Sequence, residues 1–243
     1  MKINSRLKQI GDLVDTNSLV LDIGCDHALL DIYLVENKIV KKAVAADVAE
    51  GPLKCAKENI KRYKMDDKIE ARLGNGLETY TNDIDTVIIS GMGGRTTIGM
   101  FKYNIKTAKK INTLILSPNN YQEDVRKFFT SIGFYIEDEK LVKEGKIIYQ
   151  IIKLKRGRKH YSKKDYFFGP ILIKEKDKLF REYFLKEIKS REILINVLPK
   201  NYRWKKFITK REIKMIEKEL SWYDPCFLDT RSEVFYGKIK LWW

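Results

Sequence analysis

The stretch Val20-Leu21-Asp22-Ile23-Gly24-Cys25-Asp26-His27 decides the fold. It begins with an apolar run, turns at a glycine and leads into an amphipathic segment, which is the pattern of a strand, a tight turn and a helix. A dinucleotide-binding loop here would read G-x-G-x-x-G, but Asp26 and Leu29 occupy the second and third glycine positions. Asp22 and Asp26 would also place negative charge beside a pyrophosphate. The stretch therefore argues against a nicotinamide or flavin dinucleotide.

The segments on either side of this stretch alternate short β-branched runs with longer amphipathic runs. This alternation predicts an α/β domain with a mostly parallel, doubly wound sheet, whose ligands bind beyond the carboxyl ends of the strands. A closing pair of strands suggests an antiparallel edge. The expected strands are Ser18–Ile23, Ala43–Asp47, Lys68–Leu73, Asp85–Ser90, Thr113–Ser117, Phe134–Leu141 and Lys146–Lys153, and the expected helices are Leu29–Asn37, Pro52–Lys64 and Glu123–Ile132.

The composition describes a globular chain with a strong excess of positive charge. It has 243 residues, 44% of them hydrophobic, and a net charge of +15. The apolar fraction excludes wholesale disorder. The charge favours a polyanionic partner, with nucleic acid ahead of an anionic membrane surface, although solubility alone is another explanation.

The charge is concentrated in one part of the chain. Residues 1–155 have a net charge of +4, residues 156–225 have +10, and residues 226–243 have +1. We therefore expect a sheet domain at 1–155, a basic helical domain at 156–225 and a carboxyl-terminal tail at 226–243. Apolar residues recur at helical spacing at Phe180, Phe184 and Ile188, and again at Ile213, Ile216 and Leu220. This spacing predicts an antiparallel helical hairpin joined around Leu198–Tyr202.

The histidine and cysteine content gives no sign of a metal site or of export. Two histidines and three widely spaced cysteines form neither a zinc pattern nor a disulfide framework. We see no apolar signal-peptide core and no run of about 20 apolar residues. The expectation is a cytoplasmic protein without metal and without a membrane partner.

S-adenosylmethionine reverses the electrostatic argument against the first loop. It has no phosphate and carries sulfonium and ammonium charges, which Asp22 and Asp26 would attract. Asp47 ends the second expected strand and can accept hydrogen bonds from both ribose hydroxyls. The Gly74-Asn75-Gly76 turn follows the third strand, and the Asn75 amide can meet an adenine edge. The alternative is that these aspartates only cap helices.

A second glycine-rich loop follows the fourth expected strand. Gly91-Met92-Gly93-Gly94 has little side-chain bulk, so a ligand can approach its backbone closely. The Asn/Asp-Pro-Pro-aromatic run that is usual in exocyclic adenine-amine methyltransferases is absent here. Asn119, after the fifth strand, offers a donor and an acceptor to a base edge. Asp26 can orient a base amine, whereas Cys25 has no partner that would make it a nucleophile.

Several of these segments together resemble one known family. They are Asp22-Ile23-Gly24-Cys25-Asp26-His27-Ala28, Gly51-Pro52-Leu53, Arg72-Leu73-Gly74-Asn75-Gly76-Leu77, Ser90-Gly91-Met92-Gly93-Gly94, Leu116-Ser117-Pro118-Asn119, Tyr149 and Phe168-Gly169-Pro170. The chain resembles, over roughly residues 3–225, the bacterial tRNA (adenine-22-N1)-methyltransferases, the TrmK family. Cys25, Asn75 and Ser117 depart from the serine, aspartate and glutamine expected there.

The resemblance implies a class I Rossmann-like methyltransferase with a coiled-coil-like helical appendage, which moves a methyl group from S-adenosylmethionine to N1 of an adenine in the tRNA D-loop. Asp26 and Asn119 are the expected catalytic residues, and the protein is expected to be a monomer. The alternatives are a methyltransferase acting on another RNA or on a small molecule, and a non-catalytic RNA-binding protein on the same fold. The expected cofactor-binding residues are Asp22, Gly24, Cys25, Asp26, His27, Asp47, Val48, Gly74, Asn75, Gly76, Gly91, Met92, Gly93 and Gly94.

Basic and aromatic residues alternate in the expected helical domain, which suits a tRNA partner. Tyr161, Tyr166, Tyr202 and Trp204 lie among the cations and are candidates to stack on bases, or else to pack in the core. The residues expected to bind RNA are Arg95, Lys163, Lys164, Arg203, Lys205 and Lys206.

Overall fold

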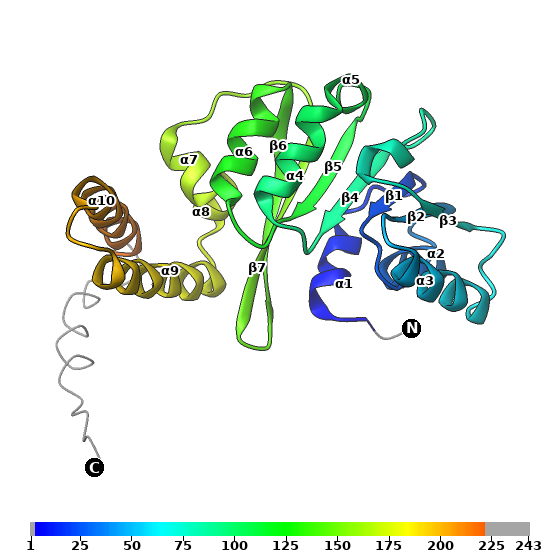
Figure 1. The fold of residues 1–243 in the computed structure, drawn as a ribbon, viewed down its shortest axis with the longest axis horizontal. Helices are drawn as coiled ribbons and strands as arrows, with labels where there is room; N and C mark the ends of the chain where they lie inside the picture. Colours follow the sequence, from blue (N-terminus) through cyan, green and yellow to red (C-terminus); the bar gives the residue numbers. More distant parts are fainter. Residues whose placement is uncertain (1–2, 222–243) are drawn as a thin grey trace, which may run out of the picture. The chain divides into compact units, whose positions relative to one another are not determined.

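The computed structural model describes residues 3–221 and contains a seven-stranded sheet (Figure 1). The strand order is β3-β2-β1-β4-β5-β7-β6, in which β7 is antiparallel to both of its neighbours and the first five strands are parallel. The strands are β1 (Leu19–Ile23), β2 (Lys42–Asp47), β3 (Ile69–Leu73), β4 (Thr86–Ser90), β5 (Thr113–Ser117), β6 (Phe134–Glu144) and β7 (Ile147–Arg156). The expected doubly wound sheet with an antiparallel edge is confirmed.

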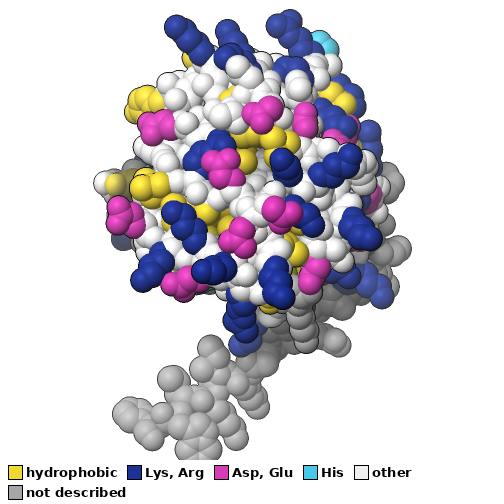
Figure 2. Space-filling model, turned by 90° about the vertical axis from the view of Figure 1, so that its right-hand side faces the viewer, with side chains coloured by type: hydrophobic (Ala, Val, Ile, Leu, Met, Phe, Trp, Pro, Cys, Tyr) yellow, Lys and Arg dark blue, Asp and Glu magenta, His cyan; other side chains and the backbone are white. Residues whose placement is uncertain are grey.

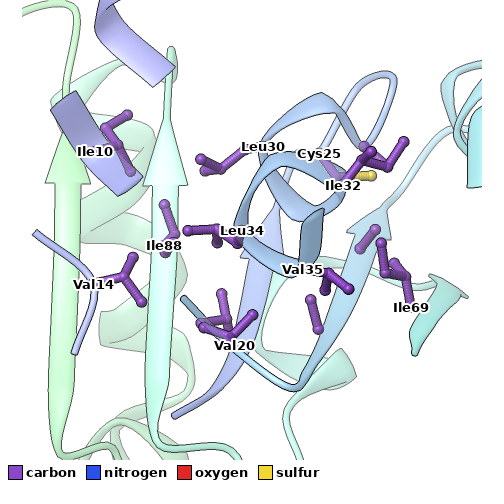
Figure 3. Close-up of a cluster of buried hydrophobic side chains, with 14 of the residues drawn as sticks. Ile10, Val14, Val20, Cys25, Leu30, Ile32, Leu34, Val35, Ile69 and Ile88 are labelled. Atoms are coloured by element: carbon purple, nitrogen blue, oxygen red, sulfur yellow. The ribbon is translucent and has the colours of Figure 1, made fainter. Parts of the chain in front are cut away.

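Helices cover both faces of the sheet because the central strands are apolar on both sides. Along β4, Ile88 enters one buried cluster, whereas Val87 and Ile89 enter the other. The first cluster includes residues of α1 (Ser5–Asp12), α2 (Leu29–Glu36) and α3 (Glu50–Arg62), and Figure 3 shows Leu30 and Leu34 of α2 beside Ile88. The second cluster includes residues of α4 (Gly94–Tyr103), α5 (Ile105–Ala108) and α6 (Gln122–Ser131).

The described chain forms two compact units, one ending at Lys176 and the other beginning at Asp177. This division lies farther along the chain than the one suggested by charge. The segment after β7, which contains α7 (Lys163–Phe168) and α8 (Leu172–Glu175), is bound to the sheet unit. The Tyr161 hydroxyl accepts a hydrogen bond from the Ile136 amide at 2.8 Å, and the Ile171 amide donates to Glu139 Oε2 at 3.0 Å. Lys163 and Lys164 therefore belong to the sheet unit.

The second unit is the expected helical hairpin. Helix α9 (Lys178–Val197) and helix α10 (Arg203–Leu220) are joined by residues 198–202. Phe180, Phe184 and Ile188 are buried on α9, and Ile213, Ile216 and Leu220 are buried on α10, as the periodicity predicts. Within residues 3–221, no helix combines the length and the apolar character that a membrane span requires. The expected tail at 226–243 lies outside the described residues.

A buried ion pair connects the sheet to the segment that leads toward the hairpin. Arg126 Nε donates to Glu139 Oε1 at 2.6 Å, and both side chains are 0% exposed. The same guanidinium donates to Gln150 Oε1 at 2.6 Å and to the Tyr166 carbonyl at 3.2 Å. Four elements, α6, β6, β7 and α7, thus share one buried guanidinium.

We predict that Glu139→Ala lowers the free energy of unfolding by about 3–5 kcal/mol, because it leaves the Arg126 charge buried without its carboxylate. Glu70→Ala is the matched control, since Glu70 pairs with Arg72 at 2.7 Å at the surface and such pairs contribute about 1 kcal/mol or less. Urea unfolding of both variants measures the difference. Equal losses would show that the buried pair does not stabilise the fold.

Candidate cofactor and substrate site

The loops at the carboxyl ends of β1, β2 and β3 are joined by main-chain hydrogen bonds. The Gly24 and Cys25 amides donate to the Ala46 carbonyl at 2.8 and 3.1 Å. The Gly74 amide donates to the Asp47 carbonyl at 3.0 Å. The three loops predicted to hold the cofactor therefore meet at one edge of the sheet, where the Asp26 and His27 side chains remain exposed.

The loop after β1 has a left-handed backbone at three of its five residues. The φ angles are 77° at Gly24, 52° at Asp26 and 53° at Ala28. A Cβ atom on Gly24 would lie 2.7 Å from Met92 Cε and would displace that side chain, and the positive φ favours glycine at this position. The Asp26 and His27 side chains are exposed and lie 3.5 Å apart.

Cys25 has a different environment from its neighbours in the loop. Its side chain belongs to the buried cluster shown in Figure 3, so only its main chain is available to a cofactor. Burial raises the pKa of the Cys25 thiol, and the nearby Asp31, Asp22 and Asp47 raise it further. The thiol therefore stays protonated, consistent with the expectation that Cys25 is not a nucleophile.

Two buried carboxyl groups lie beneath the loop, and sequence analysis identified only one of them. Asp22 is at the end of β1, and Asp31 is in the first turn of α2 and fully buried. Within residues 3–221, neither carboxyl oxygen of Asp31 has a hydrogen-bond partner. Burial raises the pKa of Asp31 to about 7, and burial together with Asp31 and Asp47 raises the pKa of Asp22. The sequence pattern of α2 did not predict the buried carboxyl group of Asp31, because the rest of that helix face is apolar.

Asp47 and Val48 present a polar and an apolar group side by side. Asp47 Oδ1 accepts a hydrogen bond from the Ala49 amide at 2.9 Å, which orients the carboxylate. The next side chain, Val48, is 67% exposed at the end of an otherwise buried strand. A carboxylate beside an exposed apolar surface suits a nucleoside, whose ribose is polar and whose base has apolar faces.

The loops after β4 and β5 hold each other closely. The Asn119 amide donates to the Met92 carbonyl at 2.9 Å, and Asn119 Nδ2 donates to the Gly91 carbonyl at 2.5 Å. Asn120 Oδ1 accepts from the Gly94 amide at 3.0 Å, and the Asn120 carbonyl leaves no room for a Cβ atom at Gly94. Because Nδ2 of Asn119 is engaged, its Oδ1 is the atom available to a substrate.

Two arginine–tyrosine pairs flank these loops. Arg95, at the start of α4, lies 4.1 Å from the ring centroid of Tyr121, and Arg6 lies 4.5 Å from that of Tyr149. Arg6 also approaches Gly91, whose Cβ position would be 3.6 Å from its guanidinium. Sequence reasoning missed Arg6 and Tyr121, since α1 was not predicted and neither residue belongs to a glycine-rich loop.

The family assignment follows from comparison with known proteins. The model of the TrmK family, tRNA (adenine(22)-N(1))-methyltransferase, matches residues 20–218. The chain belongs to the TrmK family. The tRNA (adenine(22)-N(1))-methyltransferase of Bacillus subtilis is 26% identical over 195 residues, covering 77% of this chain and 82% of that protein.

Solved structures agree with this assignment to TrmK. Streptococcus pneumoniae Sp1610 aligns with a TM-score of 0.84 at 32% identity, covering 90% of this chain and 100% of that one. A second Sp1610 structure, in complex with S-adenosyl-L-methionine, aligns with a TM-score of 0.83 at 31% identity, with the same coverage of both chains. The expected methyltransferase fold and the resemblance are confirmed, and this TrmK chain is an S-adenosylmethionine-dependent tRNA methyltransferase.

The residues at the strand ends of this TrmK chain fit that cofactor. Asp22 and Asp47 lie at strand ends and interact electrostatically with the buried Asp31 of α2, whose partnerless oxygens a nearby cationic ligand can compensate. Among the described residues, no group of three or more His, Cys, Asp or Glu side chains is arranged to hold a metal ion. Figure 2 shows the face around β3 and α3, where Lys and Arg side chains are interspersed with Asp and Glu.

We predict that Asp47→Ala weakens S-adenosylmethionine binding about tenfold or more, because one carboxylate accepting two hydroxyls is lost. Isothermal titration calorimetry measures the affinity. Asp67→Ala, an exposed acid in the turn before β3, is the control and should bind as the wild type does. Unchanged affinity in Asp47→Ala would place the ribose elsewhere.

The buried Asp31 predicts an unusual pH dependence of stability. Its pKa is about 7 in the folded protein and 3.8 in the unfolded chain. Between these two pH values the folded protein therefore keeps a proton on Asp31 that the unfolded chain has lost. The free energy of unfolding should therefore fall as the pH rises from about 4 to 7, by at most about 4 kcal/mol from this group.

We predict that the stability of Asp31→Asn relative to wild type increases as the pH rises from 4 to 8. The variant has no carboxyl group at this position, so it does not share the wild type's loss of stability with rising pH. Urea unfolding at both pH values measures the change, and Asp67→Asn is the exposed control. A difference between Asp31→Asn and wild type that does not vary with pH would mean that Asp31 is ionised in the folded protein throughout.

Proposed function

We propose that the chain methylates N1 of adenine 22 in tRNA. The match of the TrmK family model over residues 20–218 carries this proposal, and the acceptor-rich edge of the sheet supports it. S-adenosylmethionine, when bound, supplies an electrophilic methyl group on a sulfonium centre. N1 of neutral adenine has an in-plane lone pair, so the protein needs chiefly to align this atom with the methyl group.

For the cofactor, we assign Asp47 to the ribose hydroxyls and Val48 to the adenine face. The buried Asp22–Asp31 pair lies below the loop, and a cationic ammonium group near it would favour the ionised form of these carboxyl groups, whose pKa values burial raises. Gly24, Gly74 and Gly76 keep the loops free of bulk, since a Cβ atom on any of them would lie within 3 Å of Met92, Thr79 or Met100. Asp26, His27, Asn75 and Gly91 to Gly94 stay predicted cofactor contacts.

For the target base, we assign Asn119 Oδ1 to the exocyclic amine of adenine. Because Nδ2 of Asn119 is held by the Gly91 carbonyl, Oδ1 is oriented as an acceptor. Methylation at N1 leaves the base positively charged, and an acceptor on the amine stabilises that charge as it develops. Asp26, exposed in the neighbouring loop, is the second proposed acceptor and adds a favourable negative charge.

The nucleotide must leave its stack for N1 to reach the site. Arg95 with Tyr121 and Arg6 with Tyr149 offer flat surfaces beside the reaction loop. Arg95 also lines an open groove between α4 and α6, together with Lys102 and Lys127. We propose that phosphates on one side of the target nucleotide follow this groove and that the basic hairpin makes separate contacts with the tRNA.

The direct experiment is methyl transfer from labelled S-adenosylmethionine to an unmodified tRNA transcript, followed by nucleoside analysis. The expected product is 1-methyladenosine, absent when adenine 22 is replaced by guanine. Label on a transcript lacking adenine 22, or transfer only to ribosomal RNA, would overturn the proposed target. Cofactor binding without any transfer would overturn the proposed substrate, and neither transfer nor cofactor binding would favour a non-catalytic RNA-binding protein.

We predict that Asn119→Ala lowers kcat about 100-fold, because a preorganised acceptor is removed. S-adenosylmethionine affinity should stay within about twofold of wild type, which separates catalysis from cofactor binding. Asn82→Ala, an exposed asparagine that accepts from Lys110, is the control. If kcat of Asn119→Ala stays near wild type, another group holds the base.

A further inference from the structure

The tip of the helical hairpin exposes an unusual number of apolar side chains. Of the eleven large hydrophobic side chains exposed in the described part of the chain, six lie between residues 193 and 208. Trp204 is 73% exposed and Phe207 is 50% exposed. The other members of this set, which we call the tip patch, are Ile193, Val197, Tyr202 and Ile208.

Trp204 and Phe207 lie on the side of α10 that faces away from the buried residues of the hairpin. The buried residues of α10 include Thr209, Ile213 and Ile216. At 3.6 residues per turn, Trp204 and Phe207 fall on the opposite side of the helix. These two rings therefore do not contribute to the packing of the hairpin. Exposed apolar side chains that lie together commonly mark a surface that binds a partner.

The two rings form a preassembled surface. Trp204 and Phe207 are stacked, with centroids 5.6 Å apart and planes at 28°. The Arg211 guanidinium lies 5.8 Å from the Phe207 centroid, one turn farther along the same side of α10. Since helical packing and mutual contact already restrict these side chains, binding loses less conformational entropy than with isolated rings.

The charge around the tip patch selects the partner. Residues 193–211 contain no acidic residue and six basic ones, Lys200, Arg203, Lys205, Lys206, Lys210 and Arg211. In the described part of the chain none of these six forms an ion pair, and the next acid, Glu212, pairs with Arg191 at 2.9 Å. Exposed rings within uncompensated positive charge are the combination that binds single-stranded nucleic acid.

We propose that the tip patch is a stacking platform for unpaired bases of the tRNA, with the six cations holding the flanking phosphates. This rests on the proposed tRNA substrate and adds a specific contact to it. Stacking tolerates any base, so the platform would recognise an exposed loop and not a sequence.

Tyr161 and Tyr166 do not belong to this platform, although both were expected as stacking candidates. The Tyr161 hydroxyl bonds to Ile136, and the Tyr166 hydroxyl lies 3.2 Å from Thr130 Oγ1. Both rings are partly buried in the sheet unit. Tyr202 and Trp204 are the two of the four that remain exposed.

The test measures binding of labelled tRNA to full-length variants over a range of salt concentrations. Trp204→Ala should weaken binding about tenfold with an unchanged salt dependence, because stacking releases no counterions, whereas Trp204→Phe should retain most of the affinity. The pair Lys205→Gln and Lys206→Gln should instead flatten the plot of log affinity against log salt, by about two slope units. Tyr103→Ala removes an equally exposed ring of α4 and serves as the matched control.

A blunt-ended RNA duplex has phosphates but no unpaired bases, so its binding measures electrostatic attraction without stacking. Trp204→Ala should bind this duplex as the wild type does. If Trp204→Ala binds tRNA normally while the wild type forms 1-methyladenosine, the platform is wrong and the proposed function stands. Equal weakening on tRNA and duplex, or a change in sedimentation of the free protein, would also overturn it by indicating a structural or self-association role.

Discussion

The site depends on main-chain hydrogen bonds that hold the strand-end loops together. Gly24 and Gly74 bond to the end of β2, and Gly91 bonds to the end of β5. Backbone groups at strand ends would otherwise need side chains or water as partners. Because these backbone groups form hydrogen bonds with one another, the carboxylates and the Asn119 side-chain oxygen are not needed as their partners and can bind ligands. The same arrangement explains Gly94, since the Asn120 carbonyl of the neighbouring loop leaves no room for a Cβ atom there.

Burial of two carboxyl groups beneath such a loop works against the stability of the protein without ligand. An isolated buried carboxylate is strongly disfavoured, so Asp22 and Asp31 hold protons to higher pH than free carboxyl groups do. A nearby cationic ligand favours the ionised form of these carboxyl groups and offsets the cost of burying it. The burial of Asp22 and Asp31 therefore accounts both for the lower stability of the protein without ligand and for its preference for a positively charged cofactor. Functional sites commonly retain such unfavourable groups.

The sequence predicted the parts of the site that depend on local pattern. The strands, the strand-end position of Asp47 and the glycine turns all follow from periodicity and turn chemistry, and the hairpin follows from its apolar spacing. Side-chain direction and long-range packing were not accessible in this way. Cys25 turns into the core, Tyr161 bonds to β6, and Asp31 lies under a loop three residues away from it in sequence. The domain boundary predicted from the charge pattern also differs from the boundary between the two compact units. The segment after β7 is basic, but its hydrogen bonds to Arg126 and Glu139 attach it to the sheet unit.

The two units place different demands on a tRNA substrate. The sheet unit must take one base out of its stack, which requires groups that face that base and a rigid loop to hold them. The hairpin instead exposes the stacked rings of Trp204 and Phe207 among six cations. Phosphate attraction alone would bind any RNA duplex, including duplexes that offer no base to methylate. A stacking contact on unpaired bases adds affinity only where an RNA loop is open, which favours substrates whose target base is already easier to unstack.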